Sequence, residues 1–360
     1  MKIDPERLRK EERIAMELCC LYRMRGFTEY RMGAFEEYSV YMENKNFLSS
    51  ENMAVFAGAD GKLYALRPDV TLSVVKNAKA NGCTEKYFYN EKVYRLEKGS
   101  RSYKEVSQIG AEIVGTVDRA AEAEIVVLIK KTLAAAGGRS SLDLSHMGYV
   151  NGLCAALCAS GAAQEELISF LREKNVHDFE RYAEKTGIER EKADIFKEVI
   201  RLRGEPKSAL GRAKELSLNE EMRAAADELL SLTELLEELG AAREISVNFS
   251  IANNADYYNG LIFNGYVEGV PKAVLSGGRY DLLAQKFGKK AQAIGFALYL
   301  GELGAYLKED AEKTDVLLLY REGREAAALR RAEELNAAGK SVKIALSSDG
   351  GNYAAIEVIK

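Results

Sequence analysis

The amino-acid sequence predicts an α+β protein in which an antiparallel sheet is flanked by helices, interrupted by a helical insertion and followed by a short α/β tail. Strand-like segments before residue 116 are paired as strand–turn–strand units, which is typical of antiparallel sheets. Residues 161–240 interleave charged residues with Leu, Ala and Ile and contain few strand-forming runs. Strand-like segments return after residue 240, so we expect the insertion to interrupt one domain and not to separate two.

The first elements follow from local patterns. Residues 6–25 place apolar side chains at helical spacing, and Gly26 follows where a helix ends. Short strands are expected between residues 27 and 72. Asp60-Gly61 lies between two apolar runs, which predicts a hairpin turn there.

The middle of the chain repeats this organisation. Residues 70–82 predict a helix, and residues 87–115 predict two strands joined by a polar loop. Residues 118–136 predict an apolar-periodic helix that ends at Gly137-Gly138. A further strand is expected to lead into a helix over residues 141–153.

After the insertion, four strand-like segments complete the sheet. They cover residues 243–251, 261–269, 272–281 and 293–300. From residue 314 a continuous apolar run, a helix with a glycine stop and a second apolar run predict a βαβ-like tail. We therefore expect two domains, a core over 1–312 and a truncated tail over 313–360.

Composition narrows the class of protein. The 360 residues are 47% hydrophobic and 29% charged with four prolines, which indicates a soluble globular chain. A formal charge of -4 leaves no overall basic footprint for nucleic acid. The absence of a long apolar run predicts no membrane association, and a charged start predicts a cytoplasmic protein.

The cysteines offer one possible metal site. Five cysteines without framework spacing argue against a disulfide-stapled fold. Cys154 and Cys158 are four residues apart on a predicted helix, with His146 nearby. Because no second pair of ligands accompanies them, we expect core packing and no metal site.

Six polar residues recur inside otherwise apolar strand-like runs: Asp69, Thr71, Arg95, Glu97, Gln108 and Glu112. Gln108 and Glu112 are an even number of residues apart and so face one side of a strand, as do Arg95 and Glu97. Carboxylates, an amide and a guanidinium on one sheet face suit a zwitterionic small molecule. A buried salt-bridge network explains the spacing equally well.

Six ordered blocks carry a resemblance to a known family. They are ALRPDVT (65–71), YRLE (94–97), SQIGAEIVG (107–115), ADYYNGLIF (255–263), LSGGRYDLL (275–283) and IGFALYL (294–300). Over roughly residues 5–305 the chain resembles histidyl-tRNA synthetases and their paralogues. The resemblance implies a class II synthetase-like core, and it implies a histidine-binding site lined by Asp69, Thr71, Arg95, Glu97, Gln108, Glu112, Tyr257 and Tyr258.

The chain also departs from the family pattern at cation positions. Glu302 stands where the third motif ends in an arginine, and Asn253 replaces the arginine that opens the histidine block. The second-motif loop is one residue short, which leaves the register of Arg101 and Lys104 open, and Gly33 replaces the proline of the first motif. A carboxylate that faces ATP phosphates repels them, so we expect no amino-acid activation.

The combination resembles the regulatory subunits of short-form ATP phosphoribosyltransferase. It implies a non-catalytic protein without a cofactor, which forms a homodimer, assembles with the short catalytic subunit and mediates feedback inhibition by L-histidine. The short tail is expected to be a remnant of an anticodon-binding-type domain, so no tRNA is expected as a partner. A divergent histidine-tRNA ligase and a free-standing histidine sensor are the alternatives. The segment SGGRYD (276–281) favours a tight turn beside the site over a phosphate loop.

Overall fold

The computed structural model describes residues 8–44, 53–79, 82–96, 102–157, 161–252, 257–304, 306 and 314–360. The chain divides into two compact units, Met1–Tyr306 and Leu307–Lys360. The predicted boundary between residues 312 and 313 lies outside the described residues.

The first unit is built on a nine-stranded sheet of order β1-β5-β6-β12-β11-β10-β7-β9-β8. The strands are β1 (Thr28–Glu29), β5 (Glu85–Leu96), β6 (Tyr103–Gly115), β7 (Ser140–His146), β8 (Arg203–Gly204), β9 (Ile245–Asn248), β10 (Leu261–Val267), β11 (Leu275–Arg279) and β12 (Gln292–Tyr299). The α+β class is confirmed. The antiparallel prediction is incomplete, because β1 pairs with β5 and β7 with β9 in parallel.

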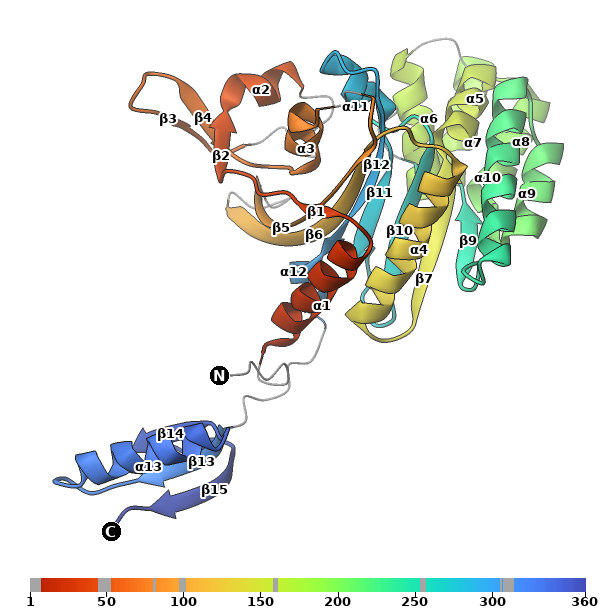
Figure 1. Ribbon diagram of the computed structural model, residues 1–360. Helices are drawn as coiled ribbons and strands as arrows, with labels where there is room; N and C mark the ends of the chain where they lie inside the picture. The colour runs from red at the N-terminus through yellow and green to blue at the C-terminus, as the bar shows by residue number, and fades with distance from the viewer. Residues whose placement is uncertain are drawn as a thin grey trace. The chain divides into compact units, whose positions relative to one another are not determined.

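One face of the sheet is covered by α1 (Lys10–Met24) and α4 (Arg119–Ala136) (Figure 1). The hydroxyls of Tyr22 in α1 and Thr132 in α4 lie 2.9 Å apart, and the Tyr22 ring packs against Phe88 and Phe296 from the strands. Asp118 caps α4 by accepting a hydrogen bond from the amide of Ala121. The opposite face of the sheet packs against α3 (Thr71–Asn77) and α11 (Asp281–Lys286) and also carries Glu112.

A small sheet precedes the main one, with the order β2-β4-β3. Its strands are β2 (Phe35–Glu37), β3 (Val55–Ala57) and β4 (Leu63–Leu66), and the neighbouring helices are α2 (Tyr38–Glu43) and α3 (Thr71–Asn77). The hairpin predicted at Asp60-Gly61 is confirmed, since β3 and β4 pair as antiparallel strands around it. Gly61 has a φ of 80°, which a residue with a side chain rarely adopts.

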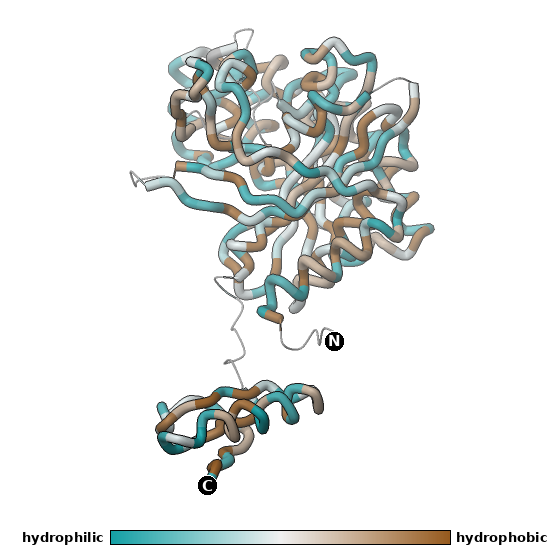
Figure 2. The backbone as a smooth tube through the Cα atoms, turned by 60° about the vertical axis from the view of Figure 1, so that its left-hand side comes forward, coloured by the Kyte–Doolittle hydropathy of each residue, from teal (hydrophilic) through white to brown (hydrophobic). Residues whose placement is uncertain are grey.

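The helical insertion lies beside the β7–β9 edge of the sheet (Figure 1). It follows α5 (Met147–Leu157) and contains α6 (Gly161–Glu173), α7 (Val176–Thr186), α8 (Arg190–Arg201), α9 (Pro206–Glu215) and α10 (Glu220–Glu238). Hydrophobic and hydrophilic stretches are interspersed along the backbone (Figure 2). In α8 and α10 the buried residues Phe196, Val199, Leu229 and Leu236 recur at helical spacing, as amphipathic helices require. The two-residue strand β8 interrupts the helices and extends the main sheet. Two short helices, α11 (Asp281–Lys286) and α12 (Leu300–Gly304), follow β11 and β12.

The second unit is a three-stranded parallel sheet with one helix. It contains β13 (Thr314–Leu319), α13 (Glu325–Ala337), β14 (Val342–Ala345) and β15 (Tyr353–Val358) in the order β14-β13-β15. Its small core is formed by Val316, Leu318, Ala332 and Leu335. The tail thus has one strand more than the βαβ pattern requires. None of the helices within the described ranges is long and apolar enough to cross a membrane.

Candidate functional site

Glu112 is the centre of the candidate site. It lies on β6 with only 1% of its surface exposed. Its Oε1 accepts hydrogen bonds from Thr71 Oγ1 at 2.9 Å and from the Tyr89 hydroxyl at 3.3 Å, and its Oε2 accepts one from the Tyr280 hydroxyl. Three hydroxyls from β5, α3 and the loop before α11 therefore converge on one carboxyl group.

Burial changes the acidity of this group. Removal from water raises the pKa of Glu112 to about 8, although its hydrogen bonds to Tyr280 and Thr71 act in the opposite direction. The charge of Asp69 raises this pKa further. A carboxyl group with such a pKa is ready to accept a ligand cation, because a cation stabilises the ionised form that burial disfavours.

Glycines on neighbouring strands give the carboxyl group its space. Gly295 on β12 lies opposite Glu112, and a Cβ there would come within 1.5 Å of Glu112 Oε2. A Cβ on Gly110 would lie 2.5 Å from the Tyr89 hydroxyl. Gly277 approaches β12 so closely that a Cβ would lie 2.1 Å from the Gly295 carbonyl oxygen. The prediction of a turn at residues 276–281 is wrong, because Gly277 lies inside strand β11. Gly277 and Gly295 permit β11 and β12 to pack closely.

Asp69 and Arg95 form the second part of the site. Asp69 Oδ1 accepts a hydrogen bond from the Leu72 amide at 3.0 Å, and Arg95 Nη2 lies 3.9 Å from Asp69 Oδ2. Burial raises the pKa of Asp69, whose side chain is 16% exposed, and the Arg95 charge opposes this. The prediction that Asp69 and Thr71 lie within strands is wrong. Asp69 lies in the loop before α3, and Thr71 is the first residue of that helix.

Tyrosine rings close the cluster. The Tyr257 and Tyr258 rings lie 4.4 Å apart, and each lies within 6.5 Å of the Tyr280 ring. The pKa of both Tyr257 and Tyr258 is raised by burial and by the charges of neighbouring groups, which include Asp69 and Glu112. The structure therefore brings Asp69, Thr71, Glu112 and the tyrosine pair together.

The remaining predicted residues have separate positions. Gln108 is buried on β6, on the same face as Glu112 and opposite Tyr299 of β12. Arg95 joins the cluster through Asp69, and its Nε also donates to the carbonyl of Pro68 at 3.0 Å. Glu97 lies outside the described residues.

Sequence reasoning missed Tyr89 and Tyr280 as parts of the site. Tyr89 stands in an apolar run at residues 87–89, where a tyrosine is usually a core residue, and Tyr280 stands between Arg279 and Asp281. Both are indeed buried in the core, but their hydroxyls point to Glu112. A buried tyrosine hydroxyl requires a hydrogen-bond partner. This requirement is the signal from which a polar partner for each tyrosine could have been predicted.

The departure at Glu302 has a clear structural consequence. Glu302 in α12 pairs with Lys272, and its carboxylate lies 3.9 Å from Lys104 Nζ. The acid therefore neutralises two lysines that could otherwise attract phosphate. Asn253 and Arg101, at the other departures, lie outside the described residues.

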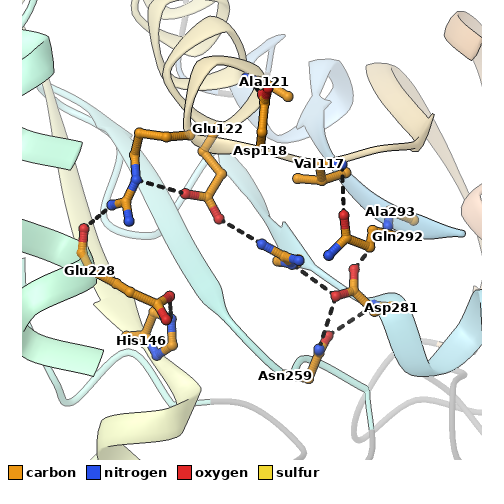
Figure 3. A network of polar contacts seen from close by, with 12 residues as sticks. Val117, Asp118, Ala121, Glu122, His146, Glu228, Asn259, Asp281, Gln292 and Ala293 are labelled. Atoms are coloured by element: carbon orange, nitrogen blue, oxygen red, sulfur yellow. Dashed lines mark hydrogen bonds and ion pairs between the residues drawn. The ribbon is translucent and has the colours of Figure 1, made fainter. Parts of the chain in front are cut away.

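A polar network holds the segment that follows the tyrosine pair (Figure 3). Asn259 donates to Asp281 Oδ2 at 3.2 Å and accepts from the Asp281 amide at 2.8 Å. Arg279 donates to Asp281 Oδ2 at 2.9 Å and to Glu122 Oε1 at 3.1 Å. Because Asn259 follows Tyr258 directly, these contacts fix the backbone that carries the tyrosines.

The same view shows how the network reaches the insertion (Figure 3). Arg119 lies 3.8 Å from Glu122 and donates to the carbonyl of Glu228 in α10. His146 Nε2 lies 3.1 Å from Glu228 Oε2, and His146 Nδ1 accepts a hydrogen bond from the Gly148 amide. Both ring nitrogens of His146 are thus occupied by protein groups. Cys154 is buried, and Cys158 lies outside the described residues.

Comparison with known proteins places this chain in a family. A family model described as histidyl-tRNA synthetase matches residues 1–303. A relative from Acetivibrio thermocellus, named ATP phosphoribosyltransferase regulatory subunit, is 28% identical over 357 residues, covering 94% of this chain and 84% of that protein.

Two solved structures share the fold. That of an ATP phosphoribosyltransferase regulatory subunit/histidyl-tRNA synthetase from Bacillus halodurans has a TM-score of 0.83 at 24% identity and covers 97% of this chain and 93% of that chain. That of an ATP phosphoribosyl transferase complex from Thermotoga maritima has a TM-score of 0.63 at 19% identity, with coverages of 81% and 97%. Because the family model matches most of its 360 residues, the chain belongs to the histidyl-tRNA synthetase family.

Proposed function

We propose that the chain is a non-catalytic regulatory subunit of an ATP phosphoribosyltransferase, and that the cluster around Glu112 binds L-histidine. The name of the Acetivibrio relative and the Thermotoga complex support the partnership with a short catalytic subunit. One observation supports a non-catalytic role: Glu302 pairs with two lysines that could otherwise attract phosphate. The hydrogen bonds of the Glu112 cluster are present in the same protein.

The chemistry of the cluster supports histidine as the ligand. A ligand ammonium or imidazolium beside Glu112 supplies the positive charge that the buried carboxylate lacks. Tyrosine rings beside the carboxyl group suit a flat imidazole. Gln108 and Arg95 are the groups that we assign to the ligand carboxylate, because an amide and a guanidinium donate hydrogen bonds to it.

Regulation requires that histidine bind two arrangements of the complex unequally. Typical coupling free energies are about 1–3 kcal/mol, which corresponds to roughly 5- to 150-fold in affinity. By reciprocity, association with the catalytic subunit changes histidine affinity by the same factor. Histidine binding measured with and without the catalytic subunit therefore reports the coupling directly.

An exposed aromatic surface on the small sheet supports the homodimer. Phe35 is 52% exposed and Phe56 41% exposed, and their rings lie 5.4 Å apart with Tyr64 beside both. Burying such a group of exposed aromatic rings against a second copy of the chain would remove apolar surface from water and stabilise the dimer. We expect Phe35→Asp to shift the chain from dimer to monomer in sedimentation velocity, whereas Met24→Asp, on α1, serves as the control.

The test of function is reconstitution with a short catalytic subunit. We expect the chain to raise ATP phosphoribosyltransferase activity, histidine to inhibit the complex, and Glu112→Gln to weaken that inhibition while the two subunits still assemble. Unchanged activity with and without the chain and histidine would refute the regulatory role. Failure of Glu112→Gln alone to change inhibition would refute only the assigned histidine site.

A second assay separates the alternatives. A histidine-dependent exchange of pyrophosphate into ATP by the chain alone would show a divergent ligase. Aminoacylation of tRNA is expected to be absent. Histidine binding without any effect on the catalytic subunit would indicate a sensor with another partner.

A further inference from the structure

A polar cavity lies beside the histidine cluster, between the sheet and the insertion. Its volume is about 600 Å³, within the range of small-molecule sites. It is lined by Asp143, Arg172, Lys174, Arg203, Asn248, Ser250, Ile251, Ala252, Asn264, Tyr266 and Ser276. None of these residues belongs to the Glu112 cluster.

The cavity has an excess of positive charge. Arg172 in α6, Lys174 after it and Arg203 in β8 all line it, whereas Asp143 is the one acid among the described residues of its lining. Within the described part of the chain, neither Arg172 nor Lys174 has a carboxylate partner. Lys174 also has a φ of 52°, a left-handed conformation that is uncommon for a side chain of this kind and that often accompanies function.

The carboxylate of Asp143 is already paired with protein groups. Asp143 is buried, with one carboxylate oxygen 3.1 Å from Arg203 Nη2 and the other accepting from Asn248 Nδ2 at 2.8 Å. Asn248 Oδ1 in turn accepts from the Ser250 amide at 3.1 Å. These contacts hold the half-exposed Arg203 side chain and leave the charges of Arg172 and Lys174 for a ligand.

The floor of the cavity offers hydroxyl and amide groups. Asn264 on β10 lies opposite both Asp143 on β7 and Ser276 on β11, so these side chains share one sheet face. Tyr266 follows two residues along β10 on that face. Such groups both donate and accept hydrogen bonds, which matches the hydroxyls of a sugar.

The cavity is separate from the histidine cluster but adjoins it. A smaller hollow of about 40 Å³ is lined by Tyr258 together with Asn264 and Ser276. The Ser276 hydroxyl lies 2.6 Å from the hydroxyl of Tyr299, which is opposite Gln108. A ligand in the larger cavity would therefore lie close to the groups proposed to hold histidine.

We propose that this cavity binds a phosphate monoester of a ribose, with the phosphate at Arg172 and Lys174 and the sugar hydroxyls on Asn264, Tyr266 and Ser276. A free pentose phosphate and a nucleoside monophosphate share this chemistry. The site is independent of whether the chain regulates a partner.

The test is calorimetric binding to the full chain, with ribose 5-phosphate, AMP, ribose and inorganic phosphate as probes. We expect 1:1 binding of at least one monoester and none of ribose. Arg172→Gln combined with Lys174→Asn should weaken binding by on the order of tenfold or more. Asn tolerates the left-handed conformation, so this variant should fold. The matched control is Lys185→Gln with Arg190→Gln, which removes equal charge from α7 and α8 outside the cavity.

A second variant tests the floor. Tyr266→Phe removes one hydroxyl and keeps the ring, so it should weaken the monoester severalfold and leave inorganic phosphate unchanged. Absence of monoester binding up to millimolar concentration would overturn the proposal. So would equal loss in the control variant, or inorganic phosphate that binds as tightly as either monoester. A short RNA that binds where both monoesters fail would also overturn it, in favour of a nucleic-acid surface. Binding of AMP but not ribose 5-phosphate identifies the ligand as a nucleotide and supports the proposal.

Discussion

Replacing Glu112 by Gln tests the proposed histidine site most directly, because the structure sets the size of the effect. With a pKa of about 8, the Glu112 carboxyl is roughly 90% protonated at pH 7 in the free protein. A ligand cation that holds the carboxylate ionised therefore forces release of about 0.9 proton on binding at pH 7. Affinity should then rise about fivefold from pH 7 to 8, because the ionised fraction of the free carboxyl rises from roughly 10% to about half.

The assay is titration calorimetry in two buffers of different ionisation enthalpy at the same pH. The difference between the observed enthalpies gives the number of protons released. Wild-type protein should release about 0.9 proton at pH 7. Glu112→Gln should release almost none and should bind histidine at least about tenfold more weakly, because it loses a charged partner.

A matched control is Glu166→Gln, on the exposed surface of α6. It should leave both proton release and affinity unchanged. Buffer-independent enthalpy in the wild-type protein, or equal proton release by the wild type and Glu112→Gln, would refute the assignment of Glu112 as the group that receives the ligand cation.

Three further predictions concern stability. Without histidine, the raised pKa of Glu112 means that the native state keeps a proton that the unfolded state loses above about pH 4.5. The free energy of unfolding should therefore fall between pH 4.5 and 8, by at most about 5 kcal/mol. Urea unfolding should show this decrease, and the decrease should be smaller in Glu112→Gln. Gly295→Ala should destabilise the folded protein by roughly 1–3 kcal/mol and abolish histidine binding, because its Cβ would overlap the Glu112 carboxyl. The control is Gly211→Ala in α9, whose Cβ would meet no atom within 4 Å. Calorimetric melting should show it to be neutral or stabilising. Asp281→Asn leaves the mostly buried Arg279 with Glu122 alone and should cost about 3 kcal/mol in urea unfolding and weaken histidine binding; unchanged affinity would show that the network does not position the tyrosine pair.

Local signals in the sequence predicted much of the fold. The hairpin at Asp60-Gly61 follows from the need for a positive φ in a tight turn. The helix over 118–136 follows from its apolar period, and it ends where Gly137 adopts a φ of 87°. Each of these features is determined by a few neighbouring residues, so one sequence is enough to find it.

Strand direction was harder to predict. The pairs β1–β5 and β7–β9 are parallel, and the residues that they join are far apart in the chain. Alternation of side chains shows which face is buried but contains no information on the direction of the partner strand. The two parallel pairs could therefore not be found from the pattern.

The candidate site was predicted only in part. The family resemblance identified Thr71 and Glu112, which form a hydrogen bond in the structure. It did not identify Tyr280, whose hydroxyl also reaches Glu112, because the contact joins residues 168 positions apart. The two lysines that pair with Glu302 depend equally on the fold, since no local pattern relates Lys104 to Lys272.

The pairing of Glu302 constrains which side chains fit at this position. An arginine there would place a third cation beside Lys104 and Lys272, so the single change Glu302→Arg replaces two attractions with two repulsions. The three side chains therefore act as one group of charges. A basic residue at position 302 would fit only together with changes at the two lysines.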